Sequence, residues 1–152
     1  MVDIGDSTNK NTELDLFVCD WLKENKYQYI PKSKFKPAKY LNQLIYTRGF
    51  IIGKSIYGTP LQGNFVIYHP KKWPEYLVIE TKWQKSTGTV DEKFPYFILN
   101  IQLNDTVKTI MLLDGGGYRK KAEDWMRRQV GNNFLNVFSM IEFKKWAKKG
   151  NL

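Results

Sequence analysis

A glutamate, any residue and a lysine occur in succession three times in the chain, as Glu24/Lys26, Glu80/Lys82 and Glu142/Lys144. The first and third pairs fall at the ends of predicted helices, where solvated charges are common. The middle pair follows an apolar run inside a predicted strand. Because strand side chains alternate between faces, Glu80, Lys82 and Gln84 share one side of that strand. Two explanations fit a row of charged residues there. The row could lie on a partly solvated face of the sheet and form a salt bridge, or it could belong to an active site.

A further polar residue is expected close to this row. The predicted strand 64–68 precedes the strand of Glu80, and Pro70 and Pro74 bound a turn between the two. Such a turn makes the strands antiparallel neighbours. Asn64 therefore falls near the edge that carries Glu80 and Lys82.

Composition narrows the possible protein classes. A length of 152 residues fits a single domain, 1–152, and 42% apolar residues are enough for a core, which excludes a disordered tail. One cysteine and one histidine exclude an internal disulfide and Cys-rich or multi-histidine metal centres. No apolar run approaches the ~20 residues of a membrane helix, and the N-terminus is unlike a signal peptide. We therefore expect a cytoplasmic protein with no membrane partner.

Positive charge is unevenly distributed. The formal net charge is +9, yet residues 1–30 carry −3, residues 31–93 carry +7 and residues 94–152 carry +5. Between Asn25 and Pro74 there are nine basic residues and no acidic one. A solvated basic face is one interpretation. A window this long without an acid favours a nucleic-acid partner, whose phosphates attract such a surface.

Periodicity and capping residues predict the elements that position these groups. Helices are expected over 12–24, 91–103, 118–130 and 139–150, and strands over 44–57, 64–68, 76–84, 107–113 and 135–138. Asp91 is expected to cap the second helix, and Ser139 with Glu142 has capping-box spacing. The order α-β-β-β-α-β-α-β-α predicts an α/β fold in which helices flank a mixed β-sheet.

The arrangement of these residues is similar to the pattern of the PD-(D/E)XK nuclease superfamily, which has the restriction-endonuclease fold. In that pattern an acid begins one strand, a loop follows, the next strand carries acid-x-Lys, and a helix comes after it. The chain resembles this superfamily over about Glu13–Leu113, most clearly in GNFVIYHP (63–70) and YLVIETKWQKSTGTVDEKFP (76–95). The resemblance implies Mg²⁺-dependent hydrolysis of DNA, with Ca²⁺ or Mn²⁺ as substitutes. Within the superfamily the chain looks most like a homing endonuclease encoded in a cyanobacterial transfer-RNA group I intron.

One position departs from the family pattern. Asn64 stands where the family has an aspartate, and a neutral amide binds Mg²⁺ less well than a carboxylate. Either Asn64 is an inactivating substitution, or the acid lies elsewhere and Asn64 is a turn residue. The acid-free window favours the first explanation, since it would otherwise hold a single acid where the pattern requires one.

The resemblance implies a role for each remaining residue of the pattern. Asn64 and Glu80 mark the metal-binding positions, and Lys82 would orient the attacking water and neutralise charge. Glu13 corresponds to an extra carboxylate on the first helix of many members, although a favourable position in the helix dipole explains it equally well. Gln84 resembles an amide that some members carry after the lysine, and a surface hydrogen bond is the alternative.

DNA contacts are expected from two groups of residues. The bent run 44–57 could enter the major groove as a ribbon and read bases through Arg48, Lys54, Ser55 and Tyr57. An ordinary sheet edge is the other interpretation. The remaining expected contacts, mainly with phosphates, are Lys32, Lys34, Lys36, Lys39, Lys85, Arg119 and Lys120.

These observations predict a site-specific endonuclease for double-stranded DNA whose catalytic activity is impaired because Asn64 replaces the expected aspartate. A domain of this size has one active site, so cutting two strands requires at least a homodimer. The resemblance implies a homotetramer. Alternatives are a type II restriction endonuclease and a non-catalytic DNA-binding module on the same fold.

Overall fold

A mixed six-stranded sheet forms the centre of the molecule. The computed structural model describes residues 5–86, 88 and 90–152, with residues 5–12 described by their backbone alone. The strands are β1 (Gln28–Tyr29), β2 (Ile45–Lys54), β3 (Pro60–His69), β4 (Trp73–Trp83), β5 (Lys108–Asp114) and β6 (Phe134–Phe138), in that spatial order. Strands β2, β3 and β4 are antiparallel, whereas β1 is parallel to β2, and β5 and β6 are parallel to β4. The predicted mixed α/β sheet is confirmed.

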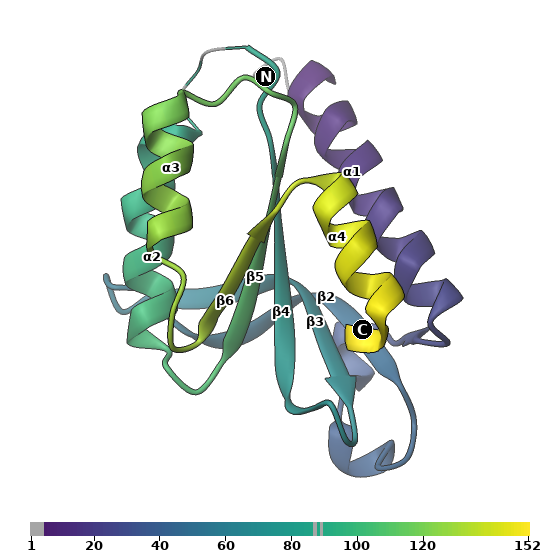
Figure 1. Cartoon of the computed structure of the whole chain (residues 1–152). Helices are drawn as coiled ribbons and strands as arrows, with labels where there is room; N and C mark the ends of the chain where they lie inside the picture. The colour runs from purple at the N-terminus through teal and green to yellow at the C-terminus, as the bar shows by residue number, and fades with distance from the viewer. Residues whose placement is uncertain (1–4, 87, 89) are drawn as a thin grey trace.

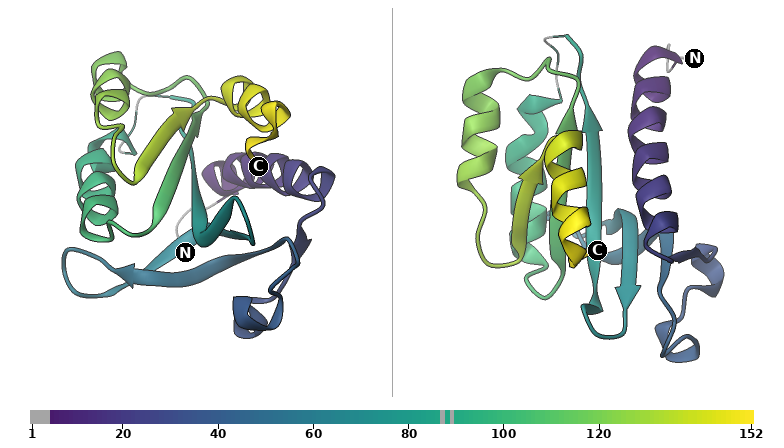
Figure 2. Two further views of the ribbon diagram at one scale, coloured as in Figure 1. Left: turned by 60° about the horizontal axis from the view of Figure 1, so that its bottom comes forward. Right: turned by 45° about the vertical axis from the view of Figure 1, so that its right-hand side comes forward.

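Helices cover both faces of this sheet (Figures 1 and 2). They are α1 (Gly5–Glu24), α2 (Phe94–Leu103), α3 (Lys120–Arg128) and α4 (Met140–Trp146), the last followed by a wide turn over Ala147–Asn151. Helices α1 and α4 share one buried cluster with the sheet, and α2 and α3 share another on the opposite face. In α1 the buried residues Leu14, Val18 and Leu22 recur at helical spacing, which directs them all at the sheet. None of the described helices is long and apolar enough to cross a membrane.

Strand β4 runs through the middle of the sheet between β3 and β5. Leu77 and Ile79 are buried in the cluster under α1 and α4, while Val78 lies in a third cluster on the other face. This alternation continues along the strand. Glu80 and Lys82 therefore project from the face that α2 covers.

Several element boundaries differ from the sequence-based predictions. The strand expected over 44–57 ends at Lys54, because Ser55–Thr59 form a turn closed by a backbone hydrogen bond of 2.8 Å. Short strand β1 and the one-turn 3₁₀ helices Lys32–Lys34 and Pro37–Lys39 were not predicted. Too few residues make up each of these elements to show a period.

Of the helix caps expected at Asp91 and at Ser139, only the second is present. The Ser139 hydroxyl accepts the Glu142 N–H at 3.2 Å while Glu142 Oε1 accepts the Ser139 N–H at 3.0 Å, so the predicted capping box is present. Asp91 does not cap α2. It begins the 3₁₀ turn Asp91–Lys93 that leads into the helix, and its carboxylate is directed at Arg119.

The tip of the β2–β3 hairpin is attached to α2. The Ile56 N–H donates to Asn100 Oδ1 at 2.9 Å, and Asn104 Nδ2 donates to the Lys54 carbonyl at 2.9 Å. The close approach depends on Gly53, where a β-carbon would lie 1.9 Å from Asn104 Oδ1. The hairpin and α2 consequently border the same space above β4.

Candidate active site

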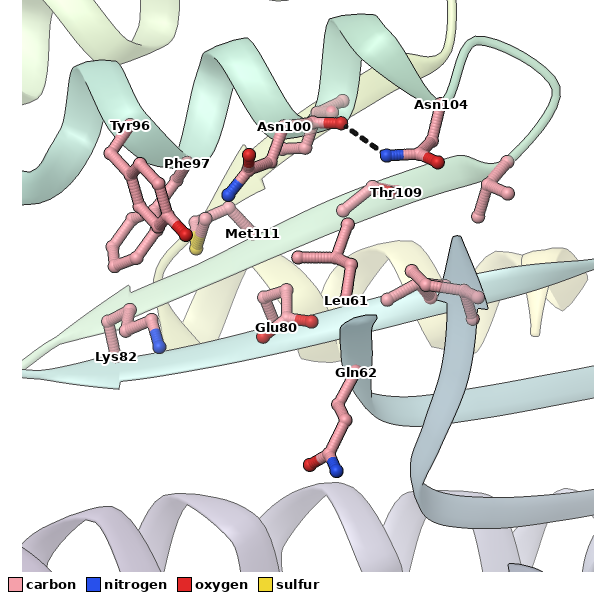
Figure 3. A pocket seen from close by; sticks show the side chains of 14 residues that line it. Leu61, Gln62, Glu80, Lys82, Tyr96, Phe97, Asn100, Asn104, Thr109 and Met111 are labelled. Atoms are coloured by element: carbon pink, nitrogen blue, oxygen red, sulfur yellow. Dashed lines mark hydrogen bonds between the residues drawn. The ribbon is translucent and has the colours of Figure 1, made fainter. Parts of the chain in front are cut away.

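Glu80 and Lys82 lie in a cavity of about 160 Å³ between the sheet and α2. Figure 3 shows both side chains along β4, with Tyr96 and Phe97 of α2 across from them. Leu61 of the β2–β3 hairpin contributes another wall. The predicted charged row of β4 therefore faces a concave site and not open solvent, as expected for an active site.

The Lys82 ammonium is held by an aromatic ring. Its Nζ lies 4.7 Å from the centre of the Phe97 ring, a cation–π distance. Within the described part of the chain, Lys82 forms no ion pair with Glu80 or any other acid. The ammonium is thus positioned in the cavity with its charge available to an anionic ligand.

The Glu80 carboxylate is held by the backbone of the neighbouring strand. The Asn64 N–H donates to Glu80 Oε1 at 3.0 Å. Burial raises the pKa of Glu80, while the Lys82 charge and the Asn64 N–H act in the opposite direction. Any cation that enters the cavity would favour the ionised form of Glu80.

A hydrogen-bonded network lies behind this carboxylate, on the face covered by α1. Arg48 Nη2 donates to Asp15 Oδ2 at 2.6 Å and to Asn64 Oδ1 at 2.9 Å. The Thr81 hydroxyl donates to Asp15 Oδ1 at 2.5 Å and accepts from Asn64 Nδ2 at 2.5 Å. Through this network α1, β2, β3 and β4 together fix the position of Asn64, and hence of the N–H that holds Glu80.

The side chain of Asn64 is not placed as expected. Its amide oxygen accepts from Arg48 and its amide nitrogen donates to Thr81, whereas only its backbone N–H contacts Glu80. Thr81 follows Glu80 on the strand and so faces α1. The structure therefore does not direct the Asn64 oxygen into the cavity as a metal ligand.

The carboxylate that α1 contributes to this network is Asp15, which the sequence analysis missed. Glu13, the residue expected there, is exposed. Asp15 precedes Val18 by three residues and Leu22 by seven, a spacing that places it on the buried side of the helix. That spacing was the signal that could have identified it.

Gln84 is held outside the cavity. Its Nε2 donates to the Gly117 carbonyl at 2.9 Å, and its Oε1 accepts the Val90 N–H at 3.0 Å. A β-carbon on Gly117 would lie 2.4 Å from the carbonyl carbon of Lys85, so the two loops approach to a distance that only glycine permits. Gln84 thus joins the loop after β4 to the loop after β5, which accounts for its burial.

Asp91 and Arg119 join the same loops by an ion pair. Asp91 accepts from Arg119 Nη2 at 2.6 Å, from Arg119 Nε at 3.0 Å and from the Arg119 backbone N–H at 3.0 Å. These hydrogen bonds lower the pKa of Asp91 to about 2. Arg119, expected to contact phosphate, is therefore engaged in holding the chain together.

The expected base-reading segment is only partly available. Arg48 is paired with Asp15, and Ser55 is 2% exposed with its hydroxyl 2.6 Å from Thr59 Oγ1. Lys54 and Tyr57 are exposed. In this structure Arg48 and Ser55 are thus engaged by the protein itself, and base reading by these residues stays a prediction.

The expected phosphate contacts are more accessible. Exposed side chains include Lys32, Lys34, Lys36 and Lys39 on the 3₁₀ turns, Lys85 after β4 and Lys120 at the start of α3. Lys120 is 88% exposed and forms only a long 3.5 Å pair with Asp124. The basic window is thus a solvent-facing surface, as phosphate binding requires.

A divalent cation fits this cavity only with help from a ligand. The described residues contain no group of three potential metal-ligating side chains. Glu80 supplies a carboxylate whose Oε1 is engaged by Asn64, which leaves Oε2 for a cation. Mg²⁺ is often held by one or two carboxylates together with substrate phosphates and water. Glu80 with a phosphate oxygen meets that minimum.

Comparison with known families agrees with this geometry. The sequence profile of a family described as the PD-(D/E)XK nuclease superfamily domain matches residues 7–151. The match spans the sheet, all four helices and the strands that carry Asn64, Glu80 and Lys82. Searches of curated proteins and of solved structures gave no match.

Proposed function

We propose that this chain, which belongs to the PD-(D/E)XK nuclease superfamily, hydrolyses phosphodiester bonds of DNA at Glu80 and Lys82. The observation that carries the proposal is the shared cavity. Strand β4 directs both side chains into it at the acid-x-Lys positions of the family, and the backbone of Asn64 holds Glu80 in place.

Lys82 and Glu80 have different roles in this proposal. The Lys82 ammonium binds the scissile phosphate and neutralises the charge that develops during hydrolysis. Glu80 holds the divalent metal that the family generally uses, with Mg²⁺ favoured and Ca²⁺ or Mn²⁺ as substitutes. A bound metal supplies an activated water and polarises the phosphate. Because Asn64 offers no second carboxylate, we propose that the chain as it stands binds the metal weakly and cuts slowly.

The finer activity we propose is site-specific cleavage of double-stranded DNA, of the homing-endonuclease type. Exposed lysines on the 3₁₀ turns and after β4 support the binding of a long phosphate backbone. One cavity of this kind per chain requires at least two copies to cut two strands, so we propose a homo-oligomer, with a tetramer favoured by the resemblance.

A cleavage assay tests the assignment. Asn64→Asp protein is incubated in Mg²⁺ or in EDTA with plasmids that carry candidate intron-insertion sequences. We expect linear product only in Mg²⁺, and loss of cutting with retained DNA binding on adding Glu80→Gln or Lys82→Ala. Lys145→Ala is the matched control, since this exposed lysine of α4 lies outside the cavity and is not among the expected DNA contacts. Cutting by the Glu80→Gln protein at the parent rate would disprove the proposed site.

A non-catalytic DNA-binding module is the second candidate. The observation that favours it is Arg48, whose guanidinium already supplies a positive charge between Asp15 and Asn64. In such a module, Asn64→Asp protein would bind DNA and remain inert in every divalent metal. The same assay therefore separates the two functions.

A further inference from the structure

The cavity offers more than a place for a phosphate. Opposite Glu80 and Lys82, its wall consists of Tyr96 and Phe97 from α2, and Leu61 closes another side. Its volume is about 160 Å³. A cavity of ~150 Å³ is known to hold one benzene ring. This space, which polar side chains such as Glu80, Lys82 and Asn100 also line, therefore has the size of a single planar ring and not of a base pair.

The hairpin tip limits what can enter. Hydrogen bonds from Ile56 to Asn100, and between Lys54 and Asn104, attach the tip to α2 beside the cavity. The wall is therefore continuous from the hairpin to the helix. A space of about 160 Å³ holds one base and not a base pair, so a base inside it has separated from its complement.

An exposed aromatic surface continues the cavity wall outward. Tyr57, at the hairpin tip, is 76% exposed and stacks on Tyr96 with ring centres 5.6 Å apart and planes at 25°. Tyr96 itself lines the cavity. Aromatic side chains that present a ring to solvent next to a basic surface are typical stacking platforms for unpaired bases.

We propose that the cavity binds one unpaired nucleobase of DNA and that the adjacent base stacks on Tyr57. This inference rests on the proposed nuclease function, because a base in the cavity brings its own phosphodiester to Lys82 and Glu80. The substrate strand then reaches the site with one nucleotide out of the helical stack. Extrusion is least costly where that nucleotide is already unpaired.

The test compares two short duplexes in EDTA that share one strand with a central 2-aminopurine. In the first duplex the 2-aminopurine is paired with thymine, and in the second it lies opposite no base and is unpaired. Fluorescence anisotropy gives the affinity for each, and 2-aminopurine emission reports stacking. We expect the protein to bind the duplex with the unpaired base about tenfold more tightly, with quenched emission, within the range of base–aromatic stacking. Equal affinities for the two duplexes, or unchanged emission, would overturn the proposal.

Three variants locate the effect. Leu61→Trp fills the cavity and should abolish the preference for the unpaired base. Leu103→Trp, at a residue of α2 that is 56% exposed and outside the cavity, is the matched control and should keep the preference. Tyr57→Ala should lower it several-fold without disturbing the fold, since the side chain is exposed. If both Leu61→Trp and Tyr57→Ala retain the full preference, the base binds elsewhere and the proposal fails.

Binding and cleavage are measured separately, so the two proposals can fail separately. A preference for the unpaired base without metal-dependent cutting would leave the base site standing and refute the nuclease. Metal-dependent cutting without that preference would support the nuclease and refute the base site.

Discussion

Replacing Asp91 by asparagine tests whether the ion pair with Arg119 holds the loop after β4 against the start of α3. The carboxylate is inaccessible to solvent and accepts three hydrogen bonds from Arg119, and so ties the loop after β4 to the start of α3. Asparagine keeps the shape and one acceptor but removes the charge. We therefore expect Asp91→Asn to fold and to be less stable at neutral pH.

The size of the effect follows from the acidity of the carboxyl group. The pKa of Asp91 is about 2 instead of 3.8, and each tenfold change in acidity corresponds to about 1.4 kcal/mol, which gives Asp91 at most about 2.5 kcal/mol. Solvent reaches the partner guanidinium, so screening reduces the contribution of Asp91 to about 1–2 kcal/mol. Because folding lowers this pKa, the contribution is complete above pH 3.8 and is lost as the pH falls toward 2.

Urea unfolding at a series of pH values measures this contribution. The wild-type protein should exceed Asp91→Asn in unfolding free energy by about 1–2 kcal/mol at neutral pH, with about half of the difference gone by about pH 3. Asp124→Asn is the matched control, because Asp124 is 45% exposed and its pair with Lys120 is 3.5 Å long, so no measurable change is expected. A difference that stays constant down to the lowest accessible pH would refute the electrostatic explanation.

Three further predictions concern the site and its surroundings. Glu80→Gln should raise the melting temperature at neutral pH and lose this advantage as the pH falls from neutral to the usual glutamate range, because burial raises the pKa of Glu80 and its ionised form costs stability. Arg48→Met should lower the unfolding free energy by about 2 kcal/mol, since Asp15, only 13% exposed, loses its 2.6 Å ion pair with Arg48. In salt titrations of DNA binding, Lys34→Ala should reduce the slope of log affinity against log salt by about 0.9, whereas Arg48→Met should leave the slope unchanged.

Much of the fold could be predicted because its signals are local. The apolar run 77–79 and the alternation after it identified the central strand and the face of Glu80 and Lys82. Ser139 and Glu142 identified the last helix through a contact between near neighbours in the chain. Local signals were weakest where the structure depends on distant partners. Ser55 is an example, because the hairpin tip that contains it is attached to α2 by the hydrogen bond from Ile56 to Asn100.

The site was predicted less completely because its polar groups compete for partners far apart in sequence. Charge alone made Arg48 and Arg119 candidates for DNA contact, yet each has an acid 33 or 28 residues away that takes its hydrogen bonds. Neither pairing follows from residue type or spacing. Lys34 and Lys85 have no such partner among the described residues, so for them composition and structure agree on exposure.

Residue 64 shows why pattern and geometry must be considered together. The family pattern has a carboxylate at this position, whereas the hydrogen bonds from Arg48 and to Thr81 fit an amide. Oδ1 of Asn64 accepts from Arg48, and Nδ2 donates to Thr81, whose own hydroxyl proton is already given to Asp15. A carboxylate has no proton to donate, so an aspartate would meet the Thr81 oxygen at 2.5 Å unless that hydroxyl turned away from Asp15. Activation by Asn64→Asp therefore requires the α1 contact to rearrange, which makes Asp15 and Thr81 part of any account of catalysis at this site.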